Sequence, residues 1–293
     1  MLKPYFLALC FATSLAFGQS QHRAPAPALR FDSTQGTVVV GMAVSEGLVL
    51  AADSRAVAKS ELPPGYMVVS DSTTKVFAIG KFGAATFGTA LLQHRSIATW
   101  VSEYKPDPKD DIDSFATHFT AYFVNLFGRS SSAEKESGLG FFLVGYDSSG
   151  KGKLLQVKLP EPGKPEELKN TKENQGPAWE GHREAIARLL LGYSEQILDV
   201  PPINTMSEDQ QRQLLNQLAM KVPYNMPFDH YSLQDAVDFS VEMVRVTKTM
   251  QRFAFGTVGK PGDVPGVGGS VDVLVVKGTG PQWVKQKRLT KEE

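Results

Sequence analysis

Two short, almost uninterrupted apolar segments constrain the fold of this chain more than any other feature. Residues 37–44 and 48–53 are rich in valine, leucine and alanine, and the turn Ser45–Gly47 separates them. Runs of β-branched and aliphatic residues joined by a short turn predict an antiparallel hairpin. Because neither segment alternates polar with apolar residues, we expect a sheet that is covered on both faces.

Further strands are predicted along the chain. A second hairpin at 75–87 turns at Gly80-Lys81, two strands lie at 140–146 and 154–157, and a closing strand lies at 268–276. The stretches 56–74 and 159–176 are polar and rich in turn residues, which predicts loops.

Helical segments fall into two groups between these strands. They are expected at 88–104, 112–127, 179–198, 207–222 and 232–251. Phe115, Phe119 and Phe123 repeat at helical spacing, which indicates a core-facing side of one helix. Ser232, with Asp235 three residues later, is a cap-like start for the last helix. This order predicts an α+β protein with sheets between helical layers, and we treat 37–280 as one domain.

The amino terminus differs in kind from the rest. Residues 1–18 combine Lys3, an apolar run and small residues at the end, which is typical of a signal peptide. A buried helix is the alternative, although the polar stretch at 19–23 does not continue a helical pattern. The Pro/Ala-rich segment 19–36 is predicted as a linker or pro-segment. The expected location is therefore secreted or periplasmic, not cytoplasmic.

Composition excludes several classes of function. The formal net charge is zero, so no electrostatic field favours nucleic acid or, after signal removal, a membrane. The lone cysteine, Cys10, lies in the predicted signal peptide, so disulfides are not expected. No metal-ligand spacing occurs, and no cofactor is predicted. The charged segment 281–293 is interpreted as a basic tail.

Gly36-Thr37 lies where the predicted linker meets the first strand. A threonine hydroxyl needs an adjacent base, and a cut before Thr37 would supply one in the freed α-amino group, whose pKa in simple peptides is about 8. Glycine on the acyl side leaves room for the Thr37 hydroxyl to attack its own preceding peptide bond. Alone, a Gly-Thr pair is most often just the start of a strand.

Three charged residues are predicted near Thr37. Antiparallel pairing returns the end of the second strand, with Asp53 and Arg55, to the start of the first. An odd-membered turn places Asp53 on the face of Thr37, and a two-residue turn flips it; the sequence leaves both open. Lys75 begins the next strand and can lie over the same end, paired with Asp53. The ordinary alternatives are a surface ion pair for Asp53 and Arg55 and a solvated side chain for Lys75.

These residues together resemble the opening of a proteasome core-particle subunit. The resemblance rests on Gly36-Thr37, on the run Gly47–Ala56 and on the run Lys75–Ile79. Looser likeness extends through 85–88 and 145–147 to the Gly268-Gly269 pair. The family implies a four-layer αββα sandwich of the N-terminal nucleophile (Ntn) hydrolase type.

The resemblance also implies site roles. Thr37, Asp53 and Lys75 fall on the family's catalytic threonine, aspartate and lysine, and Gly88 falls on its oxyanion donor. Arg55 and Asp263 are the implied supporting residues, Asp263 with a one-residue slip. By the same likeness Ala56, Phe77, Thr86 and Ala90 line a substrate pocket that does not favour a charged side chain.

Several positions depart from the family pattern. Val267 stands where the family has a serine, and the stretch Trp179–His182 lacks the expected Gly-Ser-Gly context. The helix at 207–222 and the signal peptide are also atypical.

Two classes of function are compatible with the sequence. The first is an exported threonine-type peptidase or amide hydrolase that processes itself at Gly36-Thr37 and acts on peptides, unfolded protein or small amides. The second is a catalytically inactive scaffold or binding protein of the same fold. Relatives that form rings imply a homo-oligomer as partner.

Overall fold

The computed structural model describes residues 36–59, 66–136, 138–254, 256–257, 260–261 and 265–287. The predicted signal peptide, and the linker as far as residue 35, lie outside these residues. No helix in the described part of the chain is long and apolar enough to cross a membrane.

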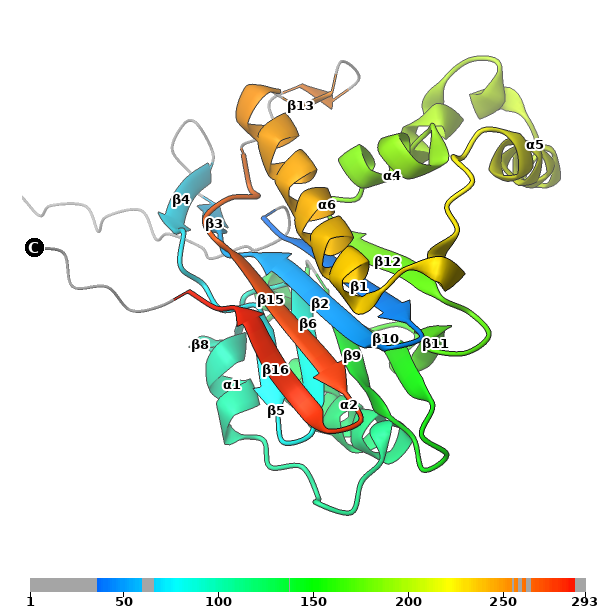
Figure 1. Cartoon of the computed structure of the whole chain (residues 1–293). Helices are drawn as coiled ribbons and strands as arrows, with labels where there is room; N and C mark the ends of the chain where they lie inside the picture. The colour runs from blue at the N-terminus through cyan, green and yellow to red at the C-terminus, as the bar shows by residue number, and fades with distance from the viewer. Residues whose placement is uncertain are drawn as a thin grey trace, which may run out of the picture.

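Two five-stranded antiparallel sheets form the body of the molecule (Figure 1). The first contains, in order, β12 (Gly176–Gly181), β1 (Val38–Val44), β2 (Gly47–Asp53), β15 (Val271–Lys277) and β16 (Gly280–Lys285). The second contains β11 (Glu166–Asn170), β10 (Gly152–Leu159), β9 (Leu139–Tyr146), β6 (Phe82–Gly88) and β5 (Val76–Ile79).

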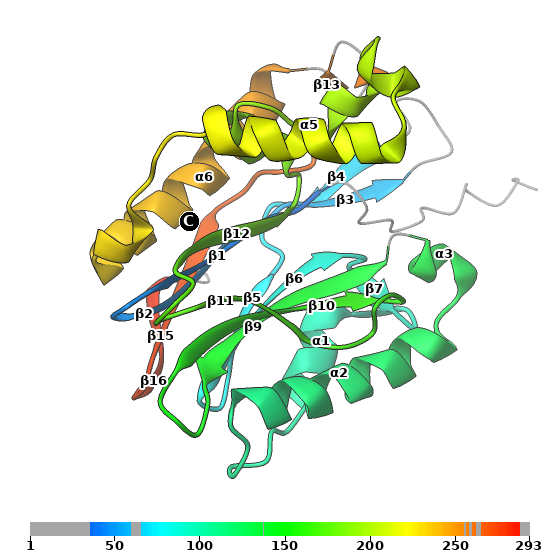
Figure 2. The ribbon, with the colours of Figure 1, turned by 90° about the vertical axis from the view of Figure 1, so that its right-hand side faces the viewer.

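Helices cover the outer face of each sheet, which Figure 2 shows from the side. On the first sheet lie α6 (Leu233–Phe253) and α4 (Glu184–Leu191); on the second lie α1 (Ile97–Glu103) and α2 (Ile112–Arg129). The fold is therefore α+β, with two sheets between helical layers, as the sequence predicts.

Three apolar layers fill the spaces between these four layers. Val38, Val40 and Met42 of β1 pack under α6, whereas Val39 and Ala43 pack against the second sheet. This division explains why β1 shows no polar alternation: both of its faces are buried. Beneath the second sheet lies an aromatic layer that includes stacked Phe82 and Phe115, with ring centroids 4.1 Å apart.

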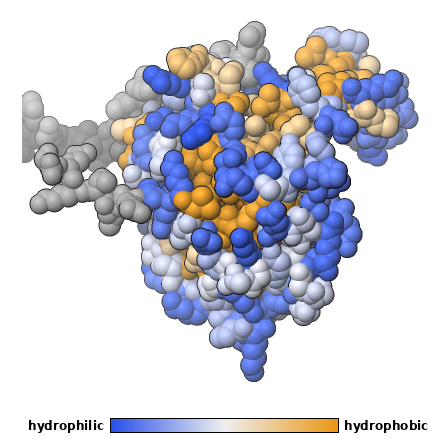
Figure 3. Space-filling model, viewed as in Figure 1, coloured by the Kyte–Doolittle hydropathy of each residue, from blue (hydrophilic) through white to orange (hydrophobic). Residues whose placement is uncertain are grey.

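Shorter elements complete the described chain. They are β3 (Ala56–Lys59), β4 (Tyr66–Ser70), β7 (Leu91–Leu92), β8 (Arg95–Ser96), α3 (Ser132–Lys135), α5 (Glu208–Lys221), β13 (Gly256–Thr257), β14 (Lys260–Pro261) and the 3₁₀ helices Glu195–Asp199, Ile203–Thr205 and Phe228–His230. The segment with α5 projects beyond the sheets (Figures 1 and 3). It exposes Val200, Met220, Val222 and Tyr224, and no residue of α5 is buried.

Two helix predictions are wrong in part. The helix expected at 88–104 begins only at Ile97, because Gln93 and His94 adopt left-handed backbone in a tight β7–β8 turn and Ser96 caps α1. The helix expected at 179–198 begins only at Glu184, because the residues before it form β12 and pair with β1. Long-range strand pairing overrides local preference there.

Three loop and tail predictions also need correction. The stretch 56–74 contains the β3–β4 hairpin, and 159–176 contains β11, an edge strand on β10. The strand β16 pairs with β15 and continues the first sheet into the segment interpreted as a basic tail. In each case the strand forms because it hydrogen-bonds to a neighbouring strand, and the local sequence pattern does not indicate this pairing.

Candidate active site

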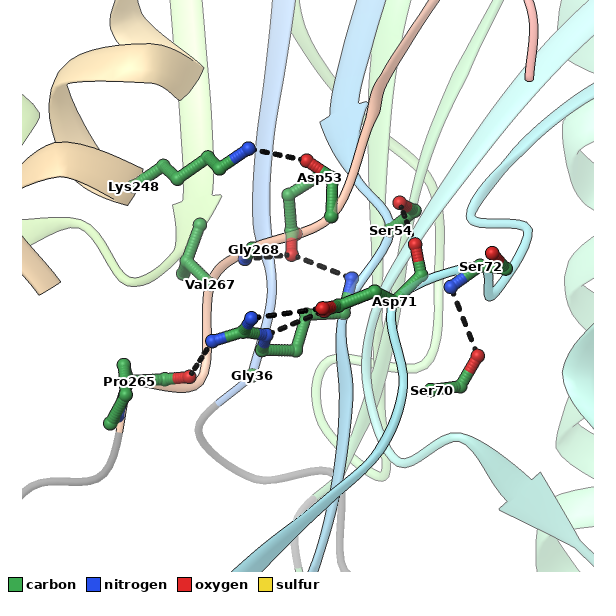
Figure 4. A network of polar contacts seen from close by, with 12 residues as sticks. Gly36, Asp53, Ser54, Ser70, Asp71, Ser72, Lys248, Pro265, Val267 and Gly268 are labelled. Atoms are coloured by element: carbon green, nitrogen blue, oxygen red, sulfur yellow. Dashed lines mark hydrogen bonds and ion pairs between the residues drawn. The ribbon is translucent and has the colours of Figure 1, made fainter. Parts of the chain in front are cut away.

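The start of β1, the end of β2, the start of β5 and the loop before β15 meet at one end of the molecule. Figure 4 shows part of this cluster, with Gly36, Asp53 and Gly268 close together. Thr37 is 7% exposed, Asp53 1% and Lys75 5%. A buried aspartate and a buried lysine are rare unless they are paired, so these contacts define the site.

Asp53 is the acceptor at the centre of the cluster. Its Oδ1 accepts from the Val38 backbone N–H at 3.0 Å and from Lys75 Nζ at 2.9 Å. Its Oδ2 accepts from the backbone N–H groups of Arg55 and Gly268, each at 3.0 Å. Three fixed backbone donors therefore hold the carboxylate in place, and Oδ1 in addition orients Lys75.

Lys75 connects Asp53 to the peptide bond before Thr37. Its Nζ donates to the Gly36 carbonyl oxygen at 2.7 Å as well as to Asp53. Burial lowers the pKa of the Lys75 ammonium, and the adjacent Asp53 charge partly offsets that effect. An ammonium in this position withdraws electron density from the Gly36 carbonyl and makes its carbon a better electrophile.

The β1–β2 turn answers the question of register. Val44 pairs with Gly47, so the loop has two residues, Ser45 and Glu46. Asp53 accordingly does not approach Thr37 side chain to side chain; it contacts the next residue's backbone, at Val38. Lys75, and not Asp53, contacts the peptide bond that precedes Thr37.

Arg55 and Ser54 tie two loops to the end of β2. The Arg55 guanidinium forms a two-pronged pair with Asp71 and donates to the Pro265 carbonyl at 2.9 Å (Figure 4). The Ser54 hydroxyl donates to the Asp71 carbonyl at 2.7 Å, and its backbone N–H donates to Gly268. The hydrogen-bonded Arg55 side chain holds the pKa of Asp71 below its usual range. Arg55 is placed to support the loops rather than to touch Lys75.

A pocket opens beside Thr37. It encloses about 440 Å³, part of it open to solvent, and Thr37, Lys75 and Gly88 all line it. Ala56, Thr86 and Ala90 line it as the sequence predicts, but Phe77 does not: its ring belongs to the layer under α1 and α2. Further lining residues are Val57, Thr73, Thr74, Thr89, Ser96 and Ile97.

One contact of Thr37 was not expected from the sequence. The His182 backbone N–H donates to the Thr37 carbonyl at 2.7 Å, and Gly181 beside it lies so close that a Cβ there would fall 1.8 Å from that oxygen. Burial, with the charge of Lys75, lowers the pKa of His182 to about 4. His182 lies inside the segment 179–198 predicted to be helical, so nothing in the sequence placed it beside residue 37. Asp263 lies outside the described residues.

No group of histidine, cysteine or acidic residues that could hold a metal ion occurs within the described ranges. The polar groups that the described residues bring to this site are a hydroxyl, an ammonium, a carboxylate and backbone N–H groups.

Part of the chain is similar to a known protein family. Residues 33–159 match the sequence model of the family described as "Proteasome subunit". None of the curated proteins matches the chain.

Solved structures of Anbu, described as an ancestral β-subunit, are similar in fold. The helical assembly of the Anbu complex from Pseudomonas aeruginosa is 14% identical, with 87% of this chain and 88% of that chain covered at a TM-score of 0.50. Anbu from Yersinia bercovieri is 12% identical, with coverage of 85% and 88% and a TM-score of 0.45. An Anbu mutant from Hyphomicrobium sp. strain MC1 is 13% identical, with coverage of 88% and 90% and a TM-score of 0.49.

The identities are low, so the likeness to the Pseudomonas aeruginosa structure is a likeness of fold. The family match spans the Thr37, Asp53, Lys75 and Gly88 positions together with both central hairpins. Residues 33–159 are thus similar to the proteasome subunit family, and the two sheets between helical layers form a proteasome-like fold.

Proposed function

We propose that this protein is a threonine-type peptidase or amide hydrolase that first cuts its own chain between Gly36 and Thr37. One observation carries the proposal: Lys75 Nζ donates to the Gly36 carbonyl at 2.7 Å while Asp53 holds the same ammonium at 2.9 Å. The carbonyl of the peptide bond to be cut is therefore already polarised in the intact chain.

The proposed self-cleavage needs two steps. The Thr37 hydroxyl oxygen bonds to the Gly36 carbonyl carbon, the C–N bond to Thr37 breaks, and the hydroxyl proton passes to the released nitrogen. This gives an ester between Gly36 and the Thr37 side chain. Water then adds to the ester carbon and returns a proton to the Thr37 oxygen, which leaves a Gly36 carboxylate and a free amino group on Thr37.

The mature site would use the same residues on other amides. The freed amino group takes the hydroxyl proton as Thr37 attacks, because an α-amino group ordinarily has a pKa of about 8, near neutral pH. Lys75, held by Asp53, lowers the proton affinity of the Thr37 oxygen. The Gly88 backbone, with φ +90° at the pocket wall, is the proposed donor to the oxyanion.

We also propose a substrate class, a location and a state of assembly for this protein. Alanine, threonine and serine side chains dominate the pocket, which fits a neutral side chain of a peptide or unfolded protein. The segment 1–18 suggests export to a secreted or periplasmic location. The described relative from Pseudomonas aeruginosa is a helical assembly, which supports a self-assembling enzyme here.

Intact mass and amino-terminal sequencing of the purified protein test the proposal. We expect a chain that begins at Thr37 in the wild type, a chain that begins near Gln19 in Thr37→Ala, and slow cleavage in Thr37→Ser, which keeps a hydroxyl. A wild-type chain that begins near Gln19 and never at Thr37 would favour a catalytically inactive scaffold. A panel of fluorogenic peptides with neutral, acidic and basic residues before the cut then addresses substrate.

A further inference from the structure

A chain of three hydrogen bonds links the Thr37 carbonyl to parts of the molecule that lie far apart in sequence. His182, just after β12, holds the Thr37 carbonyl through its backbone N–H at 2.7 Å. Its ring nitrogen Nδ1 lies 2.7 Å from Nε2 of Gln251, in the last turn of α6. Gln251 Oε1 accepts from the Val267 backbone N–H at 2.9 Å.

This chain of bonds determines which nitrogen of the imidazole carries the proton. Only the oxygen of the Gln251 amide can accept from the Val267 N–H, so the orientation of this amide is fixed. The Gln251 nitrogen, Nε2, therefore faces His182 as a donor. The Nδ1 atom of His182 must then accept this hydrogen bond, so a neutral His182 ring carries its hydrogen on its own Nε2. Protonation of Nδ1 would put two donors face to face, which agrees with the pKa of His182 being lowered to about 4 by burial and Lys75.

The same residues occupy positions where the chain departs from its family. Val267 stands where a serine is expected before the Gly268-Gly269 pair, and His182 lies where a Gly-Ser-Gly context is expected. Val267 therefore enters this linkage through its backbone N–H, which donates to Gln251, while its buried side chain packs in the layer under α6. Within the described residues the Nε2 atom of His182 is buried without a hydrogen-bond partner.

We propose that His182 is a positioning residue of the Thr37 site, held by Gln251 as the neutral Nε2–H tautomer. Its backbone fixes the Thr37 carbonyl on the β12 side of β1, as Asp53 fixes the Val38 N–H on the β2 side. Its ring, anchored to α6 and to the loop before β15, keeps that backbone in register. The neutral ring adds a hydrogen-bond donor beside Lys75 without a second positive charge. The effect on catalysis rests on the proposed self-cleavage; the tautomer and the linkage do not.

The tautomer is tested first, by ¹⁵N NMR of the full chain labelled in histidine, with the His182 signal assigned from its loss in His182→Asn. To keep the chain intact, the measurement is repeated in Thr37→Ala. We expect a neutral Nε2–H ring at pH 7. Gln251→Glu, which offers an oxygen to Nδ1, should convert the ring to an imidazolium, whereas Gln213→Glu on the exposed face of α5 should not. A wild-type ring protonated on Nδ1 at pH 7 would overturn the proposal.

Self-cleavage rates then test the positioning role. Loss of the ring in His182→Leu, or of its anchor in Gln251→Leu, should slow cleavage at Thr37 at least tenfold. His182→Asn, which keeps an acceptor for Gln251 and a donor of its own, should stay within about threefold of the wild type. Val237→Ala, a buried change on the same helix, controls for lost stability: it should unfold more easily and still cleave at the wild-type rate. Wild-type cleavage in folded His182→Leu would contradict the proposal.

The hydrogen-bond linkage can also be tested independently of self-cleavage. If the wild type is never cut before Thr37, the linkage is still measurable as hydrogen exchange of the His182 backbone amide in the intact chain. That amide should exchange at least tenfold faster in Gln251→Leu than in the wild type. Equal exchange in the two would overturn the linkage, whatever the fate of the Gly36-Thr37 bond.

Discussion

Asp53 and Lys75 are buried as a pair, but their surroundings make them unequal. Asp53 accepts from three backbone N–H groups besides Lys75, whereas Lys75 has two acceptors, Asp53 and the Gly36 carbonyl. Backbone donors cannot turn away when the acceptor changes, so a substitution at Asp53 leaves more groups unsatisfied than one at Lys75.

We therefore expect Asp53→Asn to destabilise the fold more than Lys75→Met. Breaking one partner of a buried pair costs about 3–5 kcal/mol, and Asn would in addition turn an N–H group toward a donor. Urea unfolding at pH 7 measures both, with the exposed Asp229→Asn as control, expected within about 0.5 kcal/mol of the wild type. The reverse order of the two losses would contradict this account of the site.

His182 gives the protein a defined acid sensitivity. Its pKa is lowered from 6.5 to about 4, so between these pH values the unfolded chain binds a proton that the folded chain does not. Stability from this group is complete above pH 6.5 and is lost as pH falls toward 4, by at most about 3 kcal/mol. The difference in unfolding free energy between wild type and His182→Asn, followed from pH 7 to pH 4, should shrink accordingly. A constant difference would show that folding does not shift the pKa of His182.

Residue-level prediction succeeded where spacing along one hairpin was enough. Asp53 ends β2, which pairs with the start of β1, and Lys75 directly precedes β5, so both could be placed near the start of β1. His182 and Gln251 could not, because they reach Thr37 and Val267 through pairing of β12 with β1 and through the last turn of α6. Neither contact leaves a local pattern.

At the scale of elements, the sequence predicted best those helices that show a regular apolar face or a capping pattern at their start. The helix at 112–127 has an aromatic stripe that packs against the second sheet, and α6 begins at the predicted Ser232–Asp235 cap. The edge strand β12 is the clearest failure. It is a strand because β1 needs a partner on that side, and its own residues carry no alternating pattern that would reveal it.

The end of β12 offers a sharp test of how closely it must approach Thr37. Gly181 has φ +84°, and a Cβ there would fall 1.8 Å from the Thr37 carbonyl oxygen. Gly181→Ala should cost more than the about 1–3 kcal/mol of left-handed strain alone and should slow cleavage at Thr37. Gly150→Ala is the matched control, because Gly150 has φ +76° but open space around it. Equal losses of stability in the two variants would contradict the close approach.

On the scale of the whole molecule, stability is distributed unevenly. Every residue of β1 and β2 is buried, as are all but the last residue of β9, whereas no residue of α5 is. The helix is nevertheless capped by Ser207 and Gln210. Its position was predicted from the sequence, whereas its lack of packing was not.

We expect hydrogen exchange to separate these regions. Amides of α5 should exchange through local opening, orders of magnitude faster than those of β2 and β9, which open only with the whole domain. Exchange measured at two protein concentrations also tests self-assembly: protection of α5 that grows with concentration would mean that another copy covers it. Protection of α5 equal to that of β2 in a dilute monomer would contradict the uneven distribution.

The contact between Lys75 and the Gly36 carbonyl has a kinetic meaning. Nucleophile, electrophile and ammonium belong to one folded chain, so the proposed cut is a unimolecular event whose half-life is the same at any protein concentration. A newly folded molecule would then mature without meeting another, and the time before activity begins would be set inside each copy.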